Sequence, residues 1–312
     1  MVDSKQQWKA WLYLAPAIVL LLIFTVWPII NTVRIAFLEG YNALEAAWGA
    51  TYKVGIGNFI EVLTYPDFLT CLRNTMLLTV LTVPLSTLLA LLIAVALNSI
   101  KPLQRFLQTI FFLPYVTNSI AIGMVFAAMF NIIGLRPDGS NADTWGIINN
   151  IIMFFGGDPI NWINAQSSYA ANIAVMTVYI IWNALPFKIL ILLGGLQSIN
   201  KQYYDAARVD GTPRRRVFTR ITVPLLSPML AYVIITGFIG GFKEYSSIVG
   251  IFGEKMGPVG APYSLNTMVG YIYRVLPDTD YGVASAAALV LFVIILIVTM
   301  INSAVSKRSV HF

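Results

Sequence analysis

The stretch that decides the fold is residues 204–218, which read YDAARVDGTPRRRVF. It is the longest charged insert between the apolar segments of this chain. Ala206 and Ala207 are strong helix formers and favour a short helix over residues 202–209. Gly211 follows the end of this helix, where a residue with a left-handed backbone often closes the last turn. The first half of the stretch therefore predicts a capped helix.

The second half of the stretch predicts the start of a second helix. Thr212 can place a hydroxyl at the N-cap of a further helix, and Pro213 fits the first helical position because it has no N–H to lose there. We therefore expect a helix, a glycine turn and a second helix in this stretch.

The composition around this stretch is that of an integral membrane protein. The chain has 312 residues, of which 58% are hydrophobic and 11% are charged, and its mean hydropathy is +0.75. A water-facing surface needs more charge than this. The net charge of +6 is better explained by membrane topology than by nucleic acid, so no nucleic-acid partner is expected.

Cysteine and histidine are too rare for several kinds of site. Cys71 is the only cysteine and His311 the only histidine. One cysteine excludes an intramolecular disulfide and a multi-thiolate metal site, and one histidine excludes a histidine cluster. We expect neither a metal nor a cofactor.

Six apolar segments can each cross the roughly 30 Å of hydrocarbon, which takes about 20 helical residues. They cover about residues 11–33, 74–97, 106–133, 169–196, 223–245 and 282–301. The first could also be read as a signal peptide, but its apolar run is too long and no small-residue cleavage site follows it, so we expect it to be retained. The prediction is one all-α membrane domain over residues 1–312.

Charge predicts the orientation of these spans, because short cytoplasmic loops carry an excess of Lys and Arg. With the N-terminus inside, the inner side holds Lys5, Lys9, Lys101, Arg105, Lys201, Arg208, Arg214, Arg215, Arg216, Arg220, Lys307 and Arg308. The outer side then holds Lys53, Arg73, Arg136, Lys255 and Arg274, with Arg34 at its edge. The inverted topology reverses this imbalance. We expect both termini and residues 199–220 to be cytoplasmic.

The stretch also resembles a known signature. Its form is EAA, two residues, DGA, five residues, F, two residues, I, one residue, LP, three residues and P. The matching positions are Asp205, Ala206, Ala207, Asp210, Gly211, Phe218, Ile221, Pro224 and Pro228. Asp205, Thr212 and Val223 stand where the pattern usually has Glu, Ala and Leu, and each substitution is conservative. On these residues the chain resembles the permease subunits of type I ATP-binding-cassette importers.

That resemblance implies a cytoplasmic coupling helix between the fourth and fifth of six spans. In the family this helix sits in a groove of the ATPase subunit and passes its motion to the membrane helices. The residues implied in this role are Asp205, Ala206, Ala207, Asp210 and Gly211. Small alanine side chains allow close docking, and carboxylates can pair with cations of a partner. The arginines at positions 214, 215, 216 and 220 fit a basic flank that fixes topology.

Further fragments are similar to the carbohydrate-importer branch of these permeases. They are Arg73-Asn74-Thr75, Phe111-Phe112-Leu113-Pro114, Trp182 with Pro186-Phe187, Gly195-Leu196-Gln197-Ser198-Ile199, Gly241-Phe242-Lys243-Glu244-Tyr245 and Tyr281-Gly282-Val283-Ala284-Ser285-Ala286. The outer loops are each only some thirty residues long and hold no large extra domain. The resemblance implies a sugar or oligosaccharide as the cargo.

The resemblance also implies the partners. They are a second, homologous permease in a heterodimer, two ATPase subunits, an extracellular or periplasmic solute-binding protein and the lipid of a bacterial or archaeal inner membrane. No Gly-x-x-x-x-Gly-Lys-Ser/Thr run occurs in the chain, so it has no P-loop for nucleotide phosphates. We therefore expect a translocation subunit that is not itself an enzyme.

Several residues in the spans could line the cargo path. Sugars are bound by planar polar groups and aromatic faces, and the candidates are Asn118, Asn183, Trp182, Glu244 and Tyr245. The same amides could simply join transmembrane helices. Lys243 and Glu244 could be a pair at the membrane interface, and Lys188 is expected to extend its stem to the cytosolic interface.

Two other functions stay open at this point. The same kind of permease could import glycerol phosphate or another small polar solute. An ion-coupled secondary transporter is a different class, which often has broken helices and buried acidic relays. Glu244 is the only carboxylate near the predicted spans, so the second class is less favoured.

Overall fold

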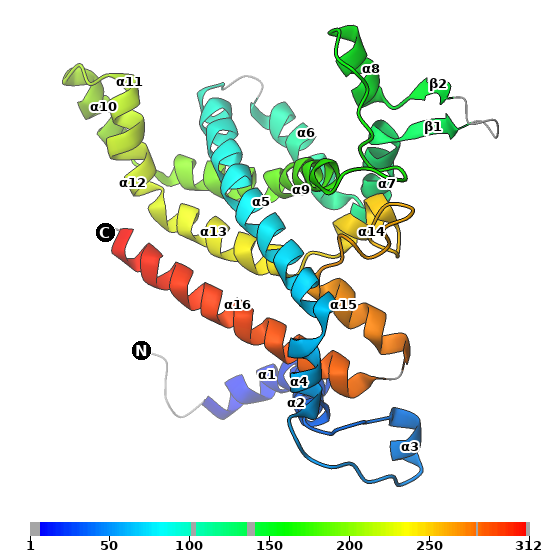
Figure 1. Cartoon of the computed structure of the whole chain (residues 1–312). Coiled ribbons are helices and arrows are strands. Elements are labelled where there is room, and N and C mark those ends of the chain that lie inside the picture. The colour runs from blue at the N-terminus through cyan, green and yellow to red at the C-terminus, as the bar shows by residue number, and fades with distance from the viewer. Residues whose placement is uncertain (1–6, 101–103, 136–140, 279, 310–312) are drawn as a thin grey trace. The chain divides into compact units, whose positions relative to one another are not determined.

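The computed structural model describes residues 7–100, 104–135, 141–278 and 280–309. Within them nearly all regular structure is helical, as Figure 1 shows. Four helices are long and apolar enough to cross a membrane, namely Trp8–Ala36, Pro66–Ser99, Tyr169–Ser198 and Tyr281–Ser306. Two bent helix pairs bring the count in the described part of the chain to six if each pair is one span.

The chain divides into two compact units. Residues 1–69 and 271–292 form the first, and residues 70–270 and 293–312 form the second. Helix α16, Tyr281–Ser309, supplies residues to both units.

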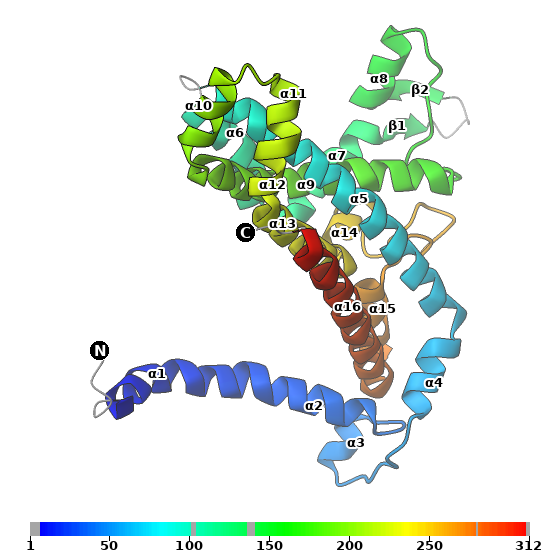
Figure 2. The same cartoon turned by 90° about the vertical axis from the view of Figure 1, so that its left-hand side faces the viewer.

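The first unit begins with a long helix. Helices α1 (Gln7–Leu21) and α2 (Trp27–Ala36) continue into each other through a π-helical turn at Leu22–Val26 (Figure 2). No residue in its most apolar stretch is buried within the chain. This is the pattern of a helix whose surroundings are as apolar as its side chains.

Short helices follow the long one in the first unit. They are α3 (Ala43–Ala47) and α4 (Gly57–Thr64). The Asn58 amide donates hydrogen bonds to the carbonyls of Ala36 and Leu38, at 3.0 and 2.9 Å. The Ala36 carbonyl is at the end of the long helix, where carbonyls lack partners within the helix, and Leu38 follows in a bridge to Val54.

Two hydrophobic clusters form the core of the second unit. Helices α5 (Pro66–Ser99) and α9 (Tyr169–Ser198) contribute to both. The first cluster holds Leu78, Phe130, Ile173, Val175, Met176, Tyr179, Ile180, Ile248, Ile251, Met256 and Leu265. The second holds Ala90, Leu91, Ala94, Leu97, Ile189, Leu192, Leu193, Leu196, Leu226 and Val233.

The segment predicted as one third span is a bent pair. Helices α6 (Gln104–Val116) and α7 (Ser119–Phe130) meet at 100°. The side chain of Asn118 accepts hydrogen bonds from the backbone N–H groups of Ile120 and Ala121, at 2.9 and 3.2 Å. This cap begins a new helix inside an apolar segment, because it satisfies N–H groups that a helix start leaves free.

The fifth predicted span is also bent. It consists of α12 (Val223–Leu225) and α13 (Ser227–Phe242), and the helix from Arg214 to Leu225 makes an angle of 67° with α13. Pro228 lies in the first turn of α13, where a proline costs no hydrogen bond.

The predicted outer segments hold regular structure that their composition does not indicate. After α7, strands β1 (Ile132–Leu135) and β2 (Asn141–Trp145) pair in antiparallel fashion and α8 (Ile147–Phe154) follows. The Gly- and Pro-rich segment after residue 245 holds α14 (Ser246–Phe252), α15 (Met268–Val275) and a 3-10 turn at Leu276–Asp278. The strands are a small addition to a helical fold.

We predict that Gly123→Ala lowers the melting temperature of the purified protein. Gly123 on α7 lies against Gly250 on α14, and a Cβ at position 123 would stand 2.7 Å from the Gly250 Cα. Overpacking of this kind typically costs about 1–3 kcal/mol. Gly194→Ala is the matched control, because a Cβ there meets nothing within 4 Å. Equal melting temperatures for the two variants would contradict the close crossing.

Candidate functional site

The stretch around residue 205 forms a separate short helix. Helix α10 runs from Lys201 to Val209, and the Asn200 side chain caps it by accepting from the Gln202 N–H at 3.0 Å. In Figure 1 it lies with the short helix α11 at one end of the second unit, on the opposite side from β1 and β2.

A left-handed glycine ends α10. Gly211 has a φ of +63°. The Thr212 N–H donates to the Ala207 carbonyl at 2.9 Å, and the Gly211 N–H donates to the Arg208 carbonyl at 3.1 Å. These two bonds form a Schellman motif, which satisfies carbonyls that the helix end leaves free. The predicted helix end and glycine turn match this geometry.

The second helix begins differently from the prediction. Helix α11 covers Arg214–Val217, and its N-cap is Pro213, which has no side-chain hydrogen bond. The expectation that Thr212 would be the N-cap and Pro213 the first helical residue is wrong, because the helix begins one residue later and its first backbone hydrogen bonds go to the Pro213 carbonyl. A π-helical turn at Phe218–Thr222 then leads into α12.

The residues implied in coupling differ in exposure. Asp205, Ala206, Asp210 and Gly211 are exposed. Ala207 is only 6% exposed, so in this structure it packs within its own chain. Asp205 and Arg208 form a surface ion pair at 3.8 Å, and such pairs contribute little to stability.

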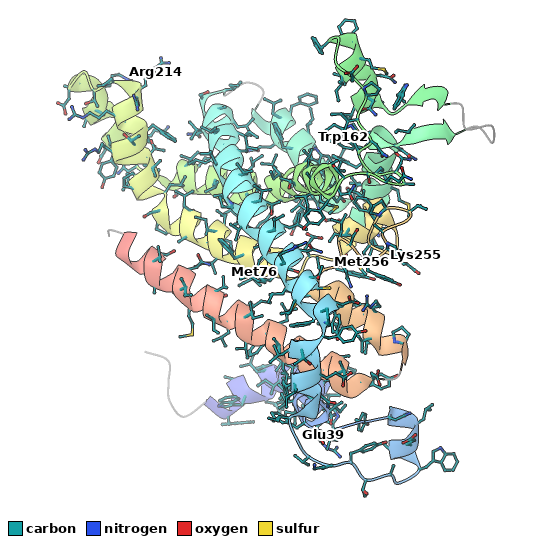
Figure 3. All side chains as sticks on the ribbon, in the orientation of Figure 1. Glu39, Met76, Trp162, Arg214, Lys255 and Met256 are labelled. Carbon is teal, nitrogen blue, oxygen red and sulfur yellow. The ribbon has the colours of Figure 1, made fainter. Side chains whose placement is uncertain are left out.

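Two grooves flank α10. One has a volume of 580 Å³ and is lined by residues that include Tyr204, Arg214 and Phe218. The other has a volume of 400 Å³ and is lined by residues that include Tyr203 and Asp210. In Figure 3, the labelled Arg214 lies at the end of the second unit that holds α10.

Two further residues of α10 present apolar surface that the sequence reasoning missed. Tyr203 is 54% exposed and Val209 is 88% exposed. The same helix carries the polar residues Lys201, Gln202, Asp205 and Arg208, and Tyr203 lines one of the two grooves. The signal in the sequence was their apolar character within a charged insert.

A second candidate site is a cleft among the long helices of the second unit. Its volume is 320 Å³. It is lined by Thr82, Val83, Ser86, Tyr115, Ile180, Asn183, Ala184, Phe187, Lys188, Thr236, Gly237, Gly240, Gly241 and Glu244. Helices α5, α9 and α13 supply most of these residues. The hydroxyl groups of Thr82 and Ser86 on α5 were missed, although these residues stand four apart and so share one helix face.

Of the predicted cargo-path residues, Asn183 and Glu244 line this cleft. The Asn183 amide donates to the Ser119 hydroxyl at 3.2 Å. Glu244 is held by the backbone, because one carboxylate oxygen accepts from the N–H groups of Tyr245 and Ser247, both at 3.1 Å. A carboxylate on backbone N–H groups has a fixed orientation.

The other three predicted cargo-path residues do not line the cleft. Asn118 uses its side-chain oxygen to cap α7. Trp182 packs against Phe126 with ring centroids 5.1 Å apart, and Tyr245 stands at the N-cap of α14. In this structure these three side chains contact other parts of the fold and not the space inside the cleft.

Lys188 is buried among the helices and does not extend to the surface. It is 4% exposed, and its ammonium group donates to the Val83 carbonyl at 3.2 Å, the Ser86 hydroxyl at 2.7 Å and the Thr87 hydroxyl at 2.9 Å. The prediction that its stem reaches the cytosolic interface is therefore wrong. Three oxygen acceptors on α5 offer the ammonium an alternative to water.

The cleft also has an aromatic wall. Tyr115 and Phe187 stack with ring centroids 5.9 Å apart and an interplanar angle of 18°. Together with the polar side chains, the wall offers hydrogen-bond donors, acceptors and aromatic faces. A small-molecule site is typically a mostly apolar cleft that contains a small number of polar groups, as this one does.

A family model matches most of this chain. It describes a binding-protein-dependent transport system inner membrane component, and it matches residues 83–311. The match includes α9, α10 and α13, and all of the cleft lining except Thr82.

Two relatives match nearly the whole chain. The lactose transport system permease protein LacF of Rhizobium radiobacter is 28% identical over 94% of this chain and 91% of its own length. The arabinooligosaccharides transport system permease protein AraP of Bacillus subtilis is 29% identical over 94% of this chain and 86% of its own length.

One solved structure has the same fold. It is the crystal structure of a bacterial ABC transporter involved in the import of the acidic polysaccharide alginate. The TM-score is 0.77 at 23% sequence identity, and the match covers 98% of this chain and 97% of that one.

We predict that Glu244→Ala lowers the melting temperature and that Glu244→Gln does so much less. Alanine removes the carboxylate oxygen that accepts from the N–H groups of Tyr245 and Ser247, and the loss of a hydrogen-bond partner typically costs about 1–3 kcal/mol where the group is shielded from water. Glutamine keeps an acceptor oxygen. Lys243→Ala is the control, because Lys243 is exposed. If Glu244→Ala and Glu244→Gln have the same melting temperature, the capping role of the carboxylate is wrong.

Proposed function

Because this chain belongs to the family of binding-protein-dependent transport system inner membrane components, we propose that it carries a sugar or oligosaccharide across the membrane as one subunit of an ATP-driven importer. The family match over residues 83–311 carries this proposal. It also confirms the family expected from residues 204–218.

The cargo class follows from the relatives and from the cleft. The two relatives described above are named for lactose and for arabino-oligosaccharides, and the similar structure imports a polysaccharide. Tyr115 and Phe187 supply aromatic faces, while Asn183 and Glu244 supply hydrogen-bonding groups. We therefore place the sugar against these four side chains.

Helix α10 is the proposed contact with an ATPase subunit. Its exposed Asp205, Ala206 and Asp210 present carboxylates and a small side chain, and two grooves lie beside it. Gly211 sets the angle between α10 and the chain that leads into α12. Ala207 packs inward, so its proposed role is to hold α10 on the fold.

The proposed assembly has four kinds of partner. They are a second permease, as a heterodimer, two ATPase subunits, a periplasmic or extracellular binding protein and the membrane lipid. A solved alginate importer was crystallised with a periplasmic protein that carries a pentasaccharide. We place both termini and α10 in the cytoplasm, where ATP is, and assign hydrolysis to the partner ATPase.

Reconstitution tests this function. The chain, expressed with its neighbouring permease, ATPase and binding protein, is expected to import radiolabelled lactose or arabinotriose into proteoliposomes only when ATP is supplied on the cytoplasmic side. Uptake driven by an ion gradient without an ATPase would contradict the proposal and favour a secondary transporter.

We predict that Gly211→Asp uncouples ATP hydrolysis from cargo. A Cβ at this position meets nothing within 4 Å, but the φ of +63° is strained for a side chain. Left-handed strain costs roughly 1 kcal/mol for most residues. Asp also adds charge at the docking surface. ATPase activity stimulated by the loaded binding protein should fall in this variant.

Gly211→Asn isolates the effect of charge, because Asn has nearly the shape of Asp, adopts the left-handed conformation about as readily and is neutral. It should keep more of the stimulation than Gly211→Asp. Normal stimulation by a fully assembled Asp variant would count against the docking role of this turn.

A further inference from the structure

Lys188 carries a charge that the fold does not compensate. Its three hydrogen bonds go to one backbone carbonyl and two hydroxyl oxygens, all on α5. Among the described residues the structure has two ion pairs, Asp205–Arg208 and Asp67–Arg274, and neither includes Lys188. The donors of the ammonium are satisfied, but its net charge remains.

The hydroxyl groups cannot remove that charge. Ser86 donates its own proton to the Thr82 carbonyl at 2.6 Å, and Thr87 donates to the Val83 carbonyl at 2.7 Å. Both hydroxyl oxygens are thus acceptors toward Lys188. An unpaired cation inside a transmembrane bundle is expensive and is usually retained for function with a specific partner.

The ammonium lies at the cleft, where a ligand can reach it. Lys188 is one of the lining residues, and so are Gly237, Gly240 and Gly241 on α13. A Cβ at position 237 would stand 3.2 Å from the Lys188 nitrogen, so a side chain there would press on the ammonium group. A Cβ at position 240 would meet nothing within 4 Å, which means that the cleft is open beside it.

The acidic group in the lining does not neutralise Lys188. Glu244 forms no ion pair with Lys188 in the part of the chain that the structure describes. One of its oxygens is held by backbone N–H groups near the start of α14. The cleft therefore has a cationic group that no described residue of this chain pairs, and a ligand in the cleft can pair it.

We propose that the Lys188 end of the cleft binds the carboxylate of an acidic sugar, so that the cargo carries at least one uronic-acid residue. This inference rests on the proposed sugar import and narrows its substrate class. The carboxylate pairs with the ammonium of Lys188 while the neutral hydroxyls of the sugar face Asn183 and Glu244. The stacked rings of Tyr115 and Phe187 lie in the same wall.

The test compares two sugars of the same skeleton. Digalacturonic acid and neutral galactobiose are titrated by equilibrium dialysis onto the purified complex of permeases and ATPase subunits. A hydrogen bond to a charged group predicts that the acidic sugar binds about tenfold more tightly or better. Lys188→Gln keeps an amide donor toward α5. In this variant the preference should disappear, because the affinity for digalacturonic acid falls more than the affinity for galactobiose.

Lys243→Gln is the matched control, because it removes a positive charge from an exposed residue beside Glu244. It should leave the preference unchanged. The selectivity of the unaltered complex decides the question even if Lys188→Gln fails to fold. If galactobiose binds as tightly as digalacturonic acid or more tightly, the acidic-sugar inference is wrong and sugar import still stands. The same conclusion follows if a folded Lys188→Gln complex loses affinity for both sugars equally. Binding of neither sugar overturns the inference and the sugar site together.

Discussion

The constraint on which this structure depends is that polar groups in an apolar chain must find partners within the protein. Hydrocarbon offers no hydrogen bonds, so each helix break at membrane depth has to be closed by the chain itself. Asn118 closes the start of α7 and Glu244 closes the start of α14. The same requirement draws the ammonium of Lys188 onto three oxygens of α5. Breaks that are closed in this way can be built where function needs them.

These breaks separate the chain into parts with different tasks. The Schellman turn at Gly211 makes α10 a distinct short helix beside two grooves. The bend between α12 and α13 then turns the chain toward the helices that line the cleft. A continuous backbone thus joins the exposed face of α10 to Gly237 and Gly240 in the cleft wall. In the proposed importer this connection passes the motion of an ATPase to the cargo path.

The sequence predicted what local chemistry determines. A helix that ends in a left-handed glycine could be read from residues 204–218, since Gly211 and the alanines before it leave few alternatives. The role of Thr212 could not, because a hydroxyl before proline is a usual start signal, and the sequence does not show that the helix begins one residue later, at Arg214. Lys188 was placed wrongly for a related reason. Its acceptors lie about a hundred residues away on α5, and hydropathy does not indicate which helices meet.

Crosslinking from α10 in native membranes tests the central claim, that this helix docks on an ATP-hydrolysing partner. The chain has one cysteine, Cys71, which is buried, so a new thiol on α10 can be labelled selectively. With Asp210→Cys, whose position is exposed, we predict a crosslink to the ATPase subunit, and with Ala207→Cys, whose position is 6% exposed, we predict little or none. An assembled, transporting complex in which position 210 never reaches an ATPase would contradict the account.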